Sequence, residues 1–185
     1  MEAKIKSINI SSRKGTAKTS VPEAQLKPDH GLIGDAHAAP GIRQVSLLAW
    51  ESIRKQNEYF KALRQEQEQL SGVNKASGDK KDCKFASGAI ELKPGDFGEN
   101  LTTQGIDLVN LKVGIRLRII PSGNTESRRS INEDIELEVT KIGKECHRYC
   151  AIYYKTGDCI MPREGIFCKV IKGGQIKAGD IIEKL

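Results

Sequence analysis

Short segments in which apolar and polar residues alternate recur along this chain of 185 residues. Alternation of this kind has the two-residue period of a strand with one buried face. Turn-forming glycine, proline and serine residues separate these segments. Strands are therefore expected at residues 4–10, 45–48, 115–119 and 135–139, with two more short strands around Gly173–Gly174 and Gly179–Asp180.

One stretch has the period of a helix instead. It is expected to begin near Ala49, and its apolar residues recur at spacings that place them on one side: Trp50, Ile53, Phe60 and Leu63. The Gln/Glu run "RQEQEQLS" follows. We expect this run to be an exposed end where the helix decays into a mobile loop at about residues 71–84.

Several short strands, one helix and no βαβ repetition predict a mainly β protein, a β-barrel with a few peripheral α-helices. Closure into a barrel also removes exposed strand edges. The length favours a single domain over residues 1–185. The chain has no G-x-x-x-x-G-K-[ST] or G-x-G-x-x-G motif, so the sequence does not indicate nucleotide-dependent chemistry.

The composition is that of an ordinary water-soluble protein, with 38% hydrophobic and 29% charged residues. No apolar run approaches the roughly 20 residues of a membrane span. The first residues, "MEAKIKSINI", lack the apolar core of a secretory signal, so a cytoplasmic location is expected. The net charge of +6 is scattered, and only 5% of residues are aromatic, which argues against a nucleic-acid partner.

Three of the five cysteines and one of the three histidines lie between Cys146 and Cys159. An odd cysteine count in a reducing compartment argues against disulfides. Structural zinc prefers two tight pairs of ligands, whereas here C-x₃-C is followed by the widely spaced Cys159 and Cys168. A metal site of Cys146, Cys150 and Cys159 nevertheless stays open as an alternative. Cys168 lies in the apolar "GIFCKVI" and is expected in the core, and Cys83 is expected to be an exposed thiol.

Cys146 is surrounded by positive charge from Lys144, His147 and Arg148, which favours its thiolate and is partly opposed by an adjacent glutamate. A thiolate attacks sulfur or binds a soft metal. Cys150 is four residues further on and shares a face with Cys146 in either a helix or a strand. His147 would point elsewhere, which suits it to proton transfer or to orienting the thiolate.

Two further segments, "DHGLIGDAHAAPGIRQVSLL" and "PGDFGENLTTQGIDL", combine glycines with polar side chains that such backbone can bring close to a ligand. Taken alone, the first also fits a surface loop with local hydrogen bonds, and the second a hairpin-like corner. The candidate residues in them are His30, Asp35, His37, Arg43, Glu99 and Asn100.

Together and in this order, the three segments resemble the MOSC domain, named for the C-terminal domain of molybdenum-cofactor sulfurases, and above all its small stand-alone bacterial members. The resemblance rests on "GLIGDAHA" with "RQVSLLAWESI", on "GDFGENLTTQGIDL", and on "GKECHRYC" with "GDCIMPREGIF" and "KVIKGGQIKAGD". It covers roughly Ile5 to Ile182. It implies a β-rich, barrel-like fold and a cysteine that carries sulfur or meets the molybdenum of a pterin cofactor.

Carried over by position, that cysteine is Cys146 or Cys150, with His147 or Arg148 steadying its thiolate. Some members show a compact C-x-R-C where this sequence has "CHRYC", with one extra residue, so both cysteines remain candidates. The resemblance also implies which residues line the cofactor pocket: Asp35, His37, Arg43, Glu99 and Asn100.

The resemblance therefore implies a protein that binds the molybdenum cofactor (molybdopterin) or carries sulfur for it, with a pterin cofactor or a sulfur donor protein as partner. If it is an enzyme, it would reduce N-oxygenated compounds at molybdenum or transfer sulfur. The alternative is a non-catalytic, cysteine-based module that holds zinc or hands a metal onward. The pyridoxal-phosphate desulfurase of larger members has no counterpart in this sequence, and no feature of the sequence indicates an oligomeric state.

Overall fold

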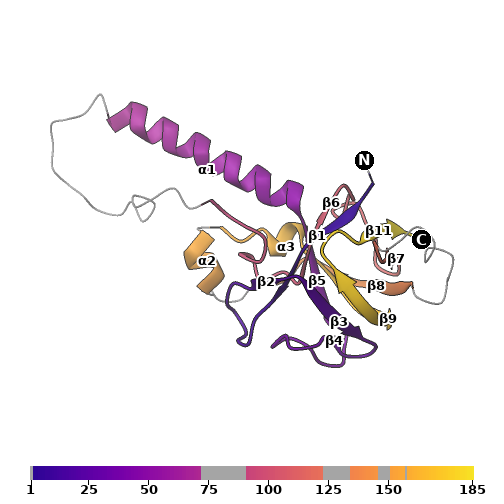
Figure 1. Cartoon of the computed structure of the whole chain (residues 1–185). Coiled ribbons are helices and arrows are strands. Elements are labelled where there is room, and N and C mark those ends of the chain that lie inside the picture. Colours follow the sequence, from indigo (N-terminus) through magenta and orange to yellow (C-terminus); the bar gives the residue numbers. More distant parts are fainter. Residues whose placement is uncertain (1, 72–90, 123–133, 146–150, 157) are drawn as a thin grey trace.

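The computed structural model describes residues 2–71, 91–122, 134–145, 151–156 and 158–185 (Figure 1). In this part of the chain, strands dominate over helices. The strands are β1 (Lys4–Ile10), β2 (Thr19–Val21), β3 (Glu23–Lys27), β4 (Gly31–Leu32), β5 (Val45–Ala49), β6 (Leu101–Gln104), β7 (Arg116–Ile120), β8 (Ile135–Ile142), β9 (Ile166–Lys172), β10 (Gly174–Lys177) and β11 (Ile181–Lys184). The helices are α1 (Trp50–Ser71), α2 (Ala151–Thr156) and α3 (Met161–Glu164).

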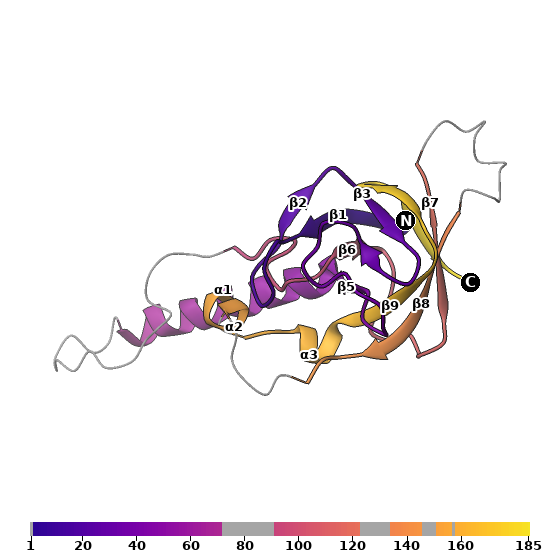
Figure 2. The same ribbon diagram turned by 90° about the horizontal axis from the view of Figure 1, so that it is seen from below.

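Seven of the strands close into a barrel, which Figures 1 and 2 show from two directions. Their order is β11-β7-β8-β9-β5-β6-β1, and β1 pairs back with β11. All these pairs are antiparallel except β5 with β6. Strand β2 adds to β1, and β10, β3 and β4 form a separate small sheet. The prediction of a mainly β, barrel-like fold with a few helices is confirmed.

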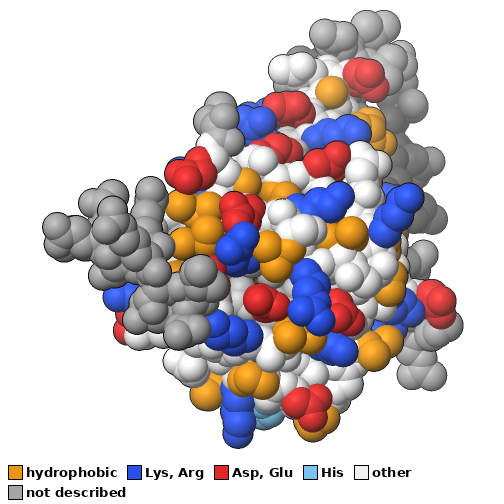
Figure 3. Space-filling model, turned by 90° about the vertical axis from the view of Figure 1, so that its right-hand side faces the viewer, with side chains coloured by type: hydrophobic (Ala, Val, Ile, Leu, Met, Phe, Trp, Pro, Cys, Tyr) orange, Lys and Arg blue, Asp and Glu red, His pale blue; other side chains and the backbone are white. Residues whose placement is uncertain are grey.

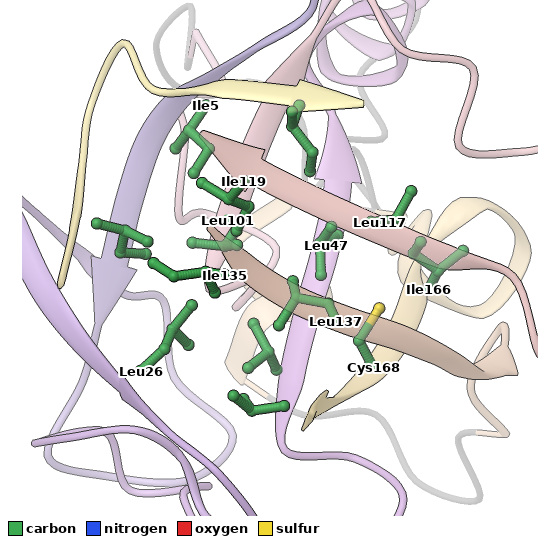
Figure 4. Close-up of a cluster of buried hydrophobic side chains, with 14 of the residues drawn as sticks. Ile5, Leu26, Leu47, Leu101, Leu117, Ile119, Ile135, Leu137, Ile166 and Cys168 are labelled. Carbon is green, nitrogen blue, oxygen red and sulfur yellow. The ribbon is translucent and has the colours of Figure 1, made fainter. Parts of the chain in front are cut away.

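Alternation along the strands fills the barrel interior. In β7, the side chains of Leu117 and Ile119 are buried, and those of Arg116 and Arg118, which alternate with them, lie on the outside. Figure 4 shows buried side chains from several strands meeting inside the barrel, Cys168 of β9 among them. Burial raises the pKa of the Cys168 thiol far above its usual range, so this cysteine is the inert core residue that the sequence predicted.

The outer face of the barrel is charged. Arg116 lies 3.4 Å from Glu136, and Arg118 lies 2.9 Å from Glu183. Figure 3, which views the right-hand side of Figure 1, shows basic and acidic side chains interspersed on that face. Exposed pairs of this kind contribute little to stability and keep the surface in water.

A second apolar cluster lies outside the barrel wall and packs the helices against it. Strand β5 is buried on both faces, with Leu47 in the barrel core and Leu48 in the second cluster. The other buried members of this second cluster are Ile53, Leu92, Phe97, Ile152, Ile160, Met161 and Phe167. The loops between β5, β6 and β9 are thereby fixed to the barrel, and the candidate site lies among them.

The helix α1 ends at Ser71, within the segment where the sequence predicts that it decays, and glutamine, glutamate and arginine are good helix formers that carry it through the Gln/Glu run. One expectation about the elements was wrong in detail. The C-terminal segment forms three strands, β9 to β11, rather than two. Most of the expected loop at 71–84 lies outside the described residues, as does Cys83. No helix in the described part of the chain is long and apolar enough to span a membrane.

Candidate functional site

A pocket of about 100 Å³ lies between the barrel wall and the helices. Residues from five separate segments of the chain line it: Gly15, Thr16, His37, Arg43, Ser46, Phe97, Gly98, Asn100, Lys144, Ile152, Cys159, Met161 and Phe167.

The ionisable side chains of this lining are basic, apart from one thiol. Arg43, Lys144 and His37 line the pocket, and none of its described lining residues is an aspartate or a glutamate. The guanidinium carbon of Arg43 lies 5.4 Å from the centre of the Phe167 ring, a cation–π contact that holds the charge at the pocket wall. The half-buried thiol of Cys159 shares the lining. The lining therefore suits an anionic ligand that tolerates a neighbouring sulfur atom.

Asp35 does not line the pocket but lies buried behind it, with its side chain only 2% exposed. Its Oδ2 accepts hydrogen bonds from Lys18 Nζ at 2.5 Å and from the Ser11 backbone N–H at 3.0 Å. Its Oδ1 accepts one from the His37 backbone N–H at 3.0 Å. The carboxylate therefore ties the loop that carries His37 to the segment after β1.

The partners of Asp35 decide its charge. Burial alone would raise the pKa of this carboxyl, but hydrogen bonds from His37 and Lys18 and the charge of Lys18 hold its pKa well below the usual range. Burial lowers the pKa of Lys18, and the hydrogen bond and charge of Asp35 oppose that effect. The result is a buried ion pair, and removing either partner would leave a charge in the protein interior.

Asn100 lines the pocket and also joins β5 to the start of β6. Its Oδ1 accepts hydrogen bonds from the Ser46 backbone N–H at 3.1 Å and from Ser46 Oγ at 2.9 Å. Its Nδ2 donates to the Asn9 carbonyl at 3.4 Å. Because its polar atoms have partners within the protein, Asn100 shapes the pocket wall.

Glu99 is fully buried next to Asn100 and is not part of the pocket lining. Its Oε1 accepts hydrogen bonds from the Gly95 backbone N–H at 2.6 Å and from Thr102 Oγ1 at 2.7 Å. Its Oε2 has no hydrogen-bond partner among the described residues. Burial raises the pKa of Glu99, and these two hydrogen bonds only partly oppose that effect.

The structure thus brings together part of the predicted site. His37, Arg43, Asn100 and Cys159 line one pocket, whereas Asp35 and Glu99 lie buried behind it. Four predicted catalytic residues lie outside the described residues: Cys146, His147, Arg148 and Cys150. Among the residues that the structure does describe, no group of three metal-binding side chains comes together around Cys159 or elsewhere.

Sequence reasoning missed several residues of this region. Phe97, Met161 and Phe167 are apolar and give no sign of a site in the sequence, and their side chains belong to the second apolar cluster as well as to the pocket. No sequence motif marked Lys18 as a site residue, because its importance comes from the fold, which places it against Asp35. Lys144 was noted only as a neighbour of Cys146.

Comparison with known proteins identifies the family. The sequence model of the MOSC domain matches residues 43–183, which is most of the chain. The chain belongs to the MOSC domain family. The matched residues include Arg43, Asn100 and the cysteine segment, whereas Lys18, Asp35 and His37 precede them. No curated protein sequence matched this MOSC protein.

Solved structures share the fold of this MOSC protein at low sequence identity. The YuaD protein of Bacillus subtilis is 18% identical, with a TM-score of 0.63, over 100% of this chain and 96% of that one. YiiM of Geobacillus stearothermophilus is 14% identical, with a TM-score of 0.59, over 99% and 75%. YiiM of Escherichia coli is 18% identical, with a TM-score of 0.55, over 100% and 70%. At such identities the likeness shows the fold alone.

Proposed function

We propose that this MOSC protein binds the molybdenum cofactor, or carries sulfur for it, through thiols of the segment that contains Cys146, Cys150 and Cys159. The observation that carries the proposal is the pocket itself. It combines the thiol of Cys159 with the cationic side chains of Arg43 and Lys144, and its described lining has no carboxylate. Lys144 and Cys159 flank Cys146 and Cys150 in the sequence.

The chemistry of these side chains fits a pterin cofactor of molybdenum. The cofactor carries an anionic phosphate, which guanidinium and ammonium groups bind well. It also presents a high-valent metal with sulfur ligands, which a soft thiolate suits. When bound, the cofactor supplies the metal centre at which oxygen or sulfur atoms are exchanged.

The residues of the chain have separate roles in this proposal. Arg43, held over the Phe167 ring, and Lys144 attract and orient the anionic group. The apolar side chains of Met161 and Phe167 exclude water, which strengthens these electrostatic contacts. A cysteine of the segment supplies the thiolate that meets the metal or holds the sulfur.

For a sulfur carrier the transfer step balances as follows. The protein thiolate attacks the outer sulfur of a persulfide on a donor protein, and the S–S bond of the donor breaks as a new S–S bond forms on the carrier. The donor leaves as a thiolate, and the attacked sulfur keeps its proton. No external oxidant is needed, because the transferred sulfur is already at the persulfide level.

Elemental and mass analysis of the full chain purified from its native host tests the proposal. We expect stoichiometric molybdenum with pterin fluorescence, or a chain heavier by one sulfur atom that returns to its normal mass on reduction. Stoichiometric zinc with neither of these would support the metal-handover alternative and overturn the proposal.

Substitutions locate the bound species. The pair Cys146→Ser and Cys150→Ser, combined in one chain, should abolish the bound species, and Cys83→Ser is the matched thiol control. Arg43→Ala should lower retained cofactor about tenfold or more, the effect of losing a charge-assisted contact. Arg54→Ala, an exposed arginine of α1, is its control. Full retention in the cysteine double variant would show that the site assignment is wrong.

A further inference from the structure

His37 has one buried ring edge and one open edge. Its Nδ1 is buried, has no close hydrogen-bond partner among the residues that the structure describes, and lies 3.5 Å from Asp35 Oδ1. Its side chain is nevertheless 38% exposed and lines the pocket. Since the buried atom is Nδ1, the exposed part of the ring is the opposite edge, which carries Nε2.

The carboxylate next to this buried nitrogen can only accept hydrogen bonds. Asp35 receives Lys18 Nζ at 2.5 Å, the Ser11 N–H at 3.0 Å and the His37 backbone N–H at 3.0 Å, all of them donors. The side chain of Lys18 is itself buried, only 1% exposed, so its ammonium group contacts the carboxylate and not solvent. An ionised carboxylate faces Nδ1 favourably only when that nitrogen carries a proton.

We propose that Asp35, clamped by Lys18, fixes the neutral ring of His37 with its proton on Nδ1, so that Nε2 presents a hydrogen-bond acceptor to the pocket. Asp35 and Lys18 are then positioning residues that act through His37. The tautomer is independent of the proposed function, and only the identity of the natural ligand rests on it. The match to the MOSC domain begins at residue 43, after all three residues.

This arrangement determines what the pocket selects. Arg43 and Lys144 favour an anion, while a lone pair on His37 Nε2 repels a fully deprotonated oxygen and attracts an O–H or N–H group. The preferred ligand is therefore an anion that keeps a proton, such as a hydrogen phosphate or a phosphate monoester that presents an adjacent N–H. Hydrogen phosphate and sulfate have the same shape and charge and differ in that proton, so they make matched probes.

The first test is the tautomer itself, observed by ¹⁵N NMR of the full chain labelled in its histidines. The spectrum is recorded at about pH 8.5, above the ordinary titration range of histidine. The signals of His37 are assigned by their loss in His37→Gln. We expect Nδ1 to be protonated and Nε2 to be unprotonated. A ring with its proton on Nε2 overturns the proposal without any variant of Asp35.

The second test changes the carboxylate. In Asp35→Asn, Lys18 and the Ser11 N–H hold the amide oxygen on their side, so the amide NH₂ takes the place of Oδ1, loses the hydrogen bond from the His37 backbone N–H and faces the His37 ring. This donor should move the ring proton to Nε2, as expected when an aspartate that orients a histidine becomes an asparagine. The matched control is Asp107→Asn, an exposed aspartate that also accepts a backbone N–H. An unchanged His37 spectrum in a folded Asp35→Asn protein contradicts the proposal.

The third test compares the binding of inorganic phosphate and sulfate at about pH 8.5, where both are dianions and phosphate alone keeps a proton. Wild-type protein should bind phosphate about tenfold more tightly than sulfate, because sulfate would leave the Nε2 lone pair facing an oxygen anion. Asp35→Asn should reduce or reverse this preference, and Asp107→Asn should keep it. Equal affinities, a preference for sulfate, or no binding of either anion would overturn the acceptor role.

These outcomes are separable from those of the proposed function. A protein that contains neither molybdenum nor persulfide refutes the proposed function, whereas the His37 tautomer and the anion preference are measured without either species. Conversely, a protein with molybdenum and a ring protonated on Nε2 would keep the proposed function and refute this inference.

Discussion

At the scale of single residues, two buried carboxyl groups behind the pocket have pKa values that are shifted in opposite directions. Asp35 receives three donors, one of them the ammonium group of Lys18, and its pKa is lowered. Glu99 receives two uncharged donors, and one of its oxygens has no hydrogen-bond partner among the described residues, so its pKa is raised. Burial raises the pKa of both groups, and the hydrogen bonds from His37 and Lys18, together with the charge of Lys18, outweigh it only for Asp35.

The pH dependence of stability tests this assignment for Asp35. A lowered folded-state pKa means that the carboxylate stabilises the fold above its unfolded-state pKa, near about 4, and loses this contribution as the pH falls. Asp35→Asn should cost about 3–5 kcal/mol near pH 7, because Lys18 is left as a buried unpaired charge, and less at about pH 3. Urea unfolding at both pH values measures the difference. An equal loss at pH 7 and pH 3 would contradict the ion pair.

The contribution of Glu99 to stability should change with pH in the opposite direction. Because its folded-state pKa is raised, its contribution is fully present below the unfolded-state value, near about 4.3, and is lost as the pH rises toward the folded-state value. Glu99→Gln keeps an oxygen for Gly95 and Thr102 and cannot ionise. Its melting temperature relative to wild type should therefore rise between about pH 5 and pH 8. A difference that stays constant with pH would show that Glu99 is not the titrating group.

Residue types in the sequence could indicate only part of this site. His37, Arg43 and Asn100 lie in segments that resemble a family, and all three line the pocket. Asp35 and Glu99 came from the same segments, but composition cannot distinguish a carboxylate that lines a pocket from one buried behind it. Lys18 was not predictable, because only the folded chain brings it to Asp35.

At the scale of elements, the turn before β6 is fixed by one glycine. Gly95 has φ +88° and accepts the Lys18 backbone N–H at 2.8 Å, while its own N–H donates to Glu99. A Cβ at this position would overlap the Lys18 carbonyl. The segment that positions the buried lysine therefore packs directly against the turn that leads to Asn100.

Two glycines with nearly the same φ allow the cost of backbone strain to be measured apart from the cost of a steric overlap. Gly95→Ala and Gly114→Ala both place a side chain at a φ near +90°, but only Gly95 has backbone within reach of the new Cβ. We expect Gly114→Ala to cost about 1–2 kcal/mol and Gly95→Ala about 3 kcal/mol or more. Urea unfolding measures both losses. If Gly95→Ala lost no more stability than Gly114→Ala, the close packing of this turn on Lys18 would be refuted.

Element types were more predictable than element ends. The helical period after Ala49 located the start of α1 correctly, and Ile53 is buried against the barrel as expected. The far end, Ser71, lies where the sequence predicts the change from helix to loop, and the polar run before it stays helical because it is built from good helix formers. By contrast, β8 continues to Ile142, beyond the end that alternation predicted. Figure 1 shows α1 projecting well beyond the barrel.

At the scale of the whole molecule, local sequence patterns could not predict which strands pair to close the barrel. Alternation predicted β1, β7 and β8, but it does not state which strands pair. The closing seam joins β1 near one end of the chain to β11 near the other, with the Ile5 N–H donating to the Asp180 carbonyl at 2.8 Å. Partners so far apart in sequence are set by the global shape, whose benefit is the removal of free strand edges.

Asp180 fixes this seam, and its removal gives a test of closure. Its buried carboxylate accepts hydrogen bonds from the Ser122 N–H at 2.7 Å, from Ser122 Oγ at 3.1 Å and from the Lys177 N–H at 2.7 Å. Asp180→Ala leaves these donors without their partner, so we expect a loss of about 2–4 kcal/mol. Asp107→Ala is the matched control, because this exposed aspartate also accepts an N–H three residues further along, and its loss should stay below about 1 kcal/mol.

Hydrogen exchange shows whether that loss reaches the seam. The Ile5 N–H donates to the Asp180 carbonyl and the Ile182 N–H donates to the Ala3 carbonyl, so both amides report on the pairing of β1 with β11. In Asp180→Ala these two amides should lose protection before those of β8 and β9, which pair along their length at the opposite side of the barrel. If all four strands lost protection together, the seam would be as strong as the rest of the wall, and the barrel would open as one cooperative unit.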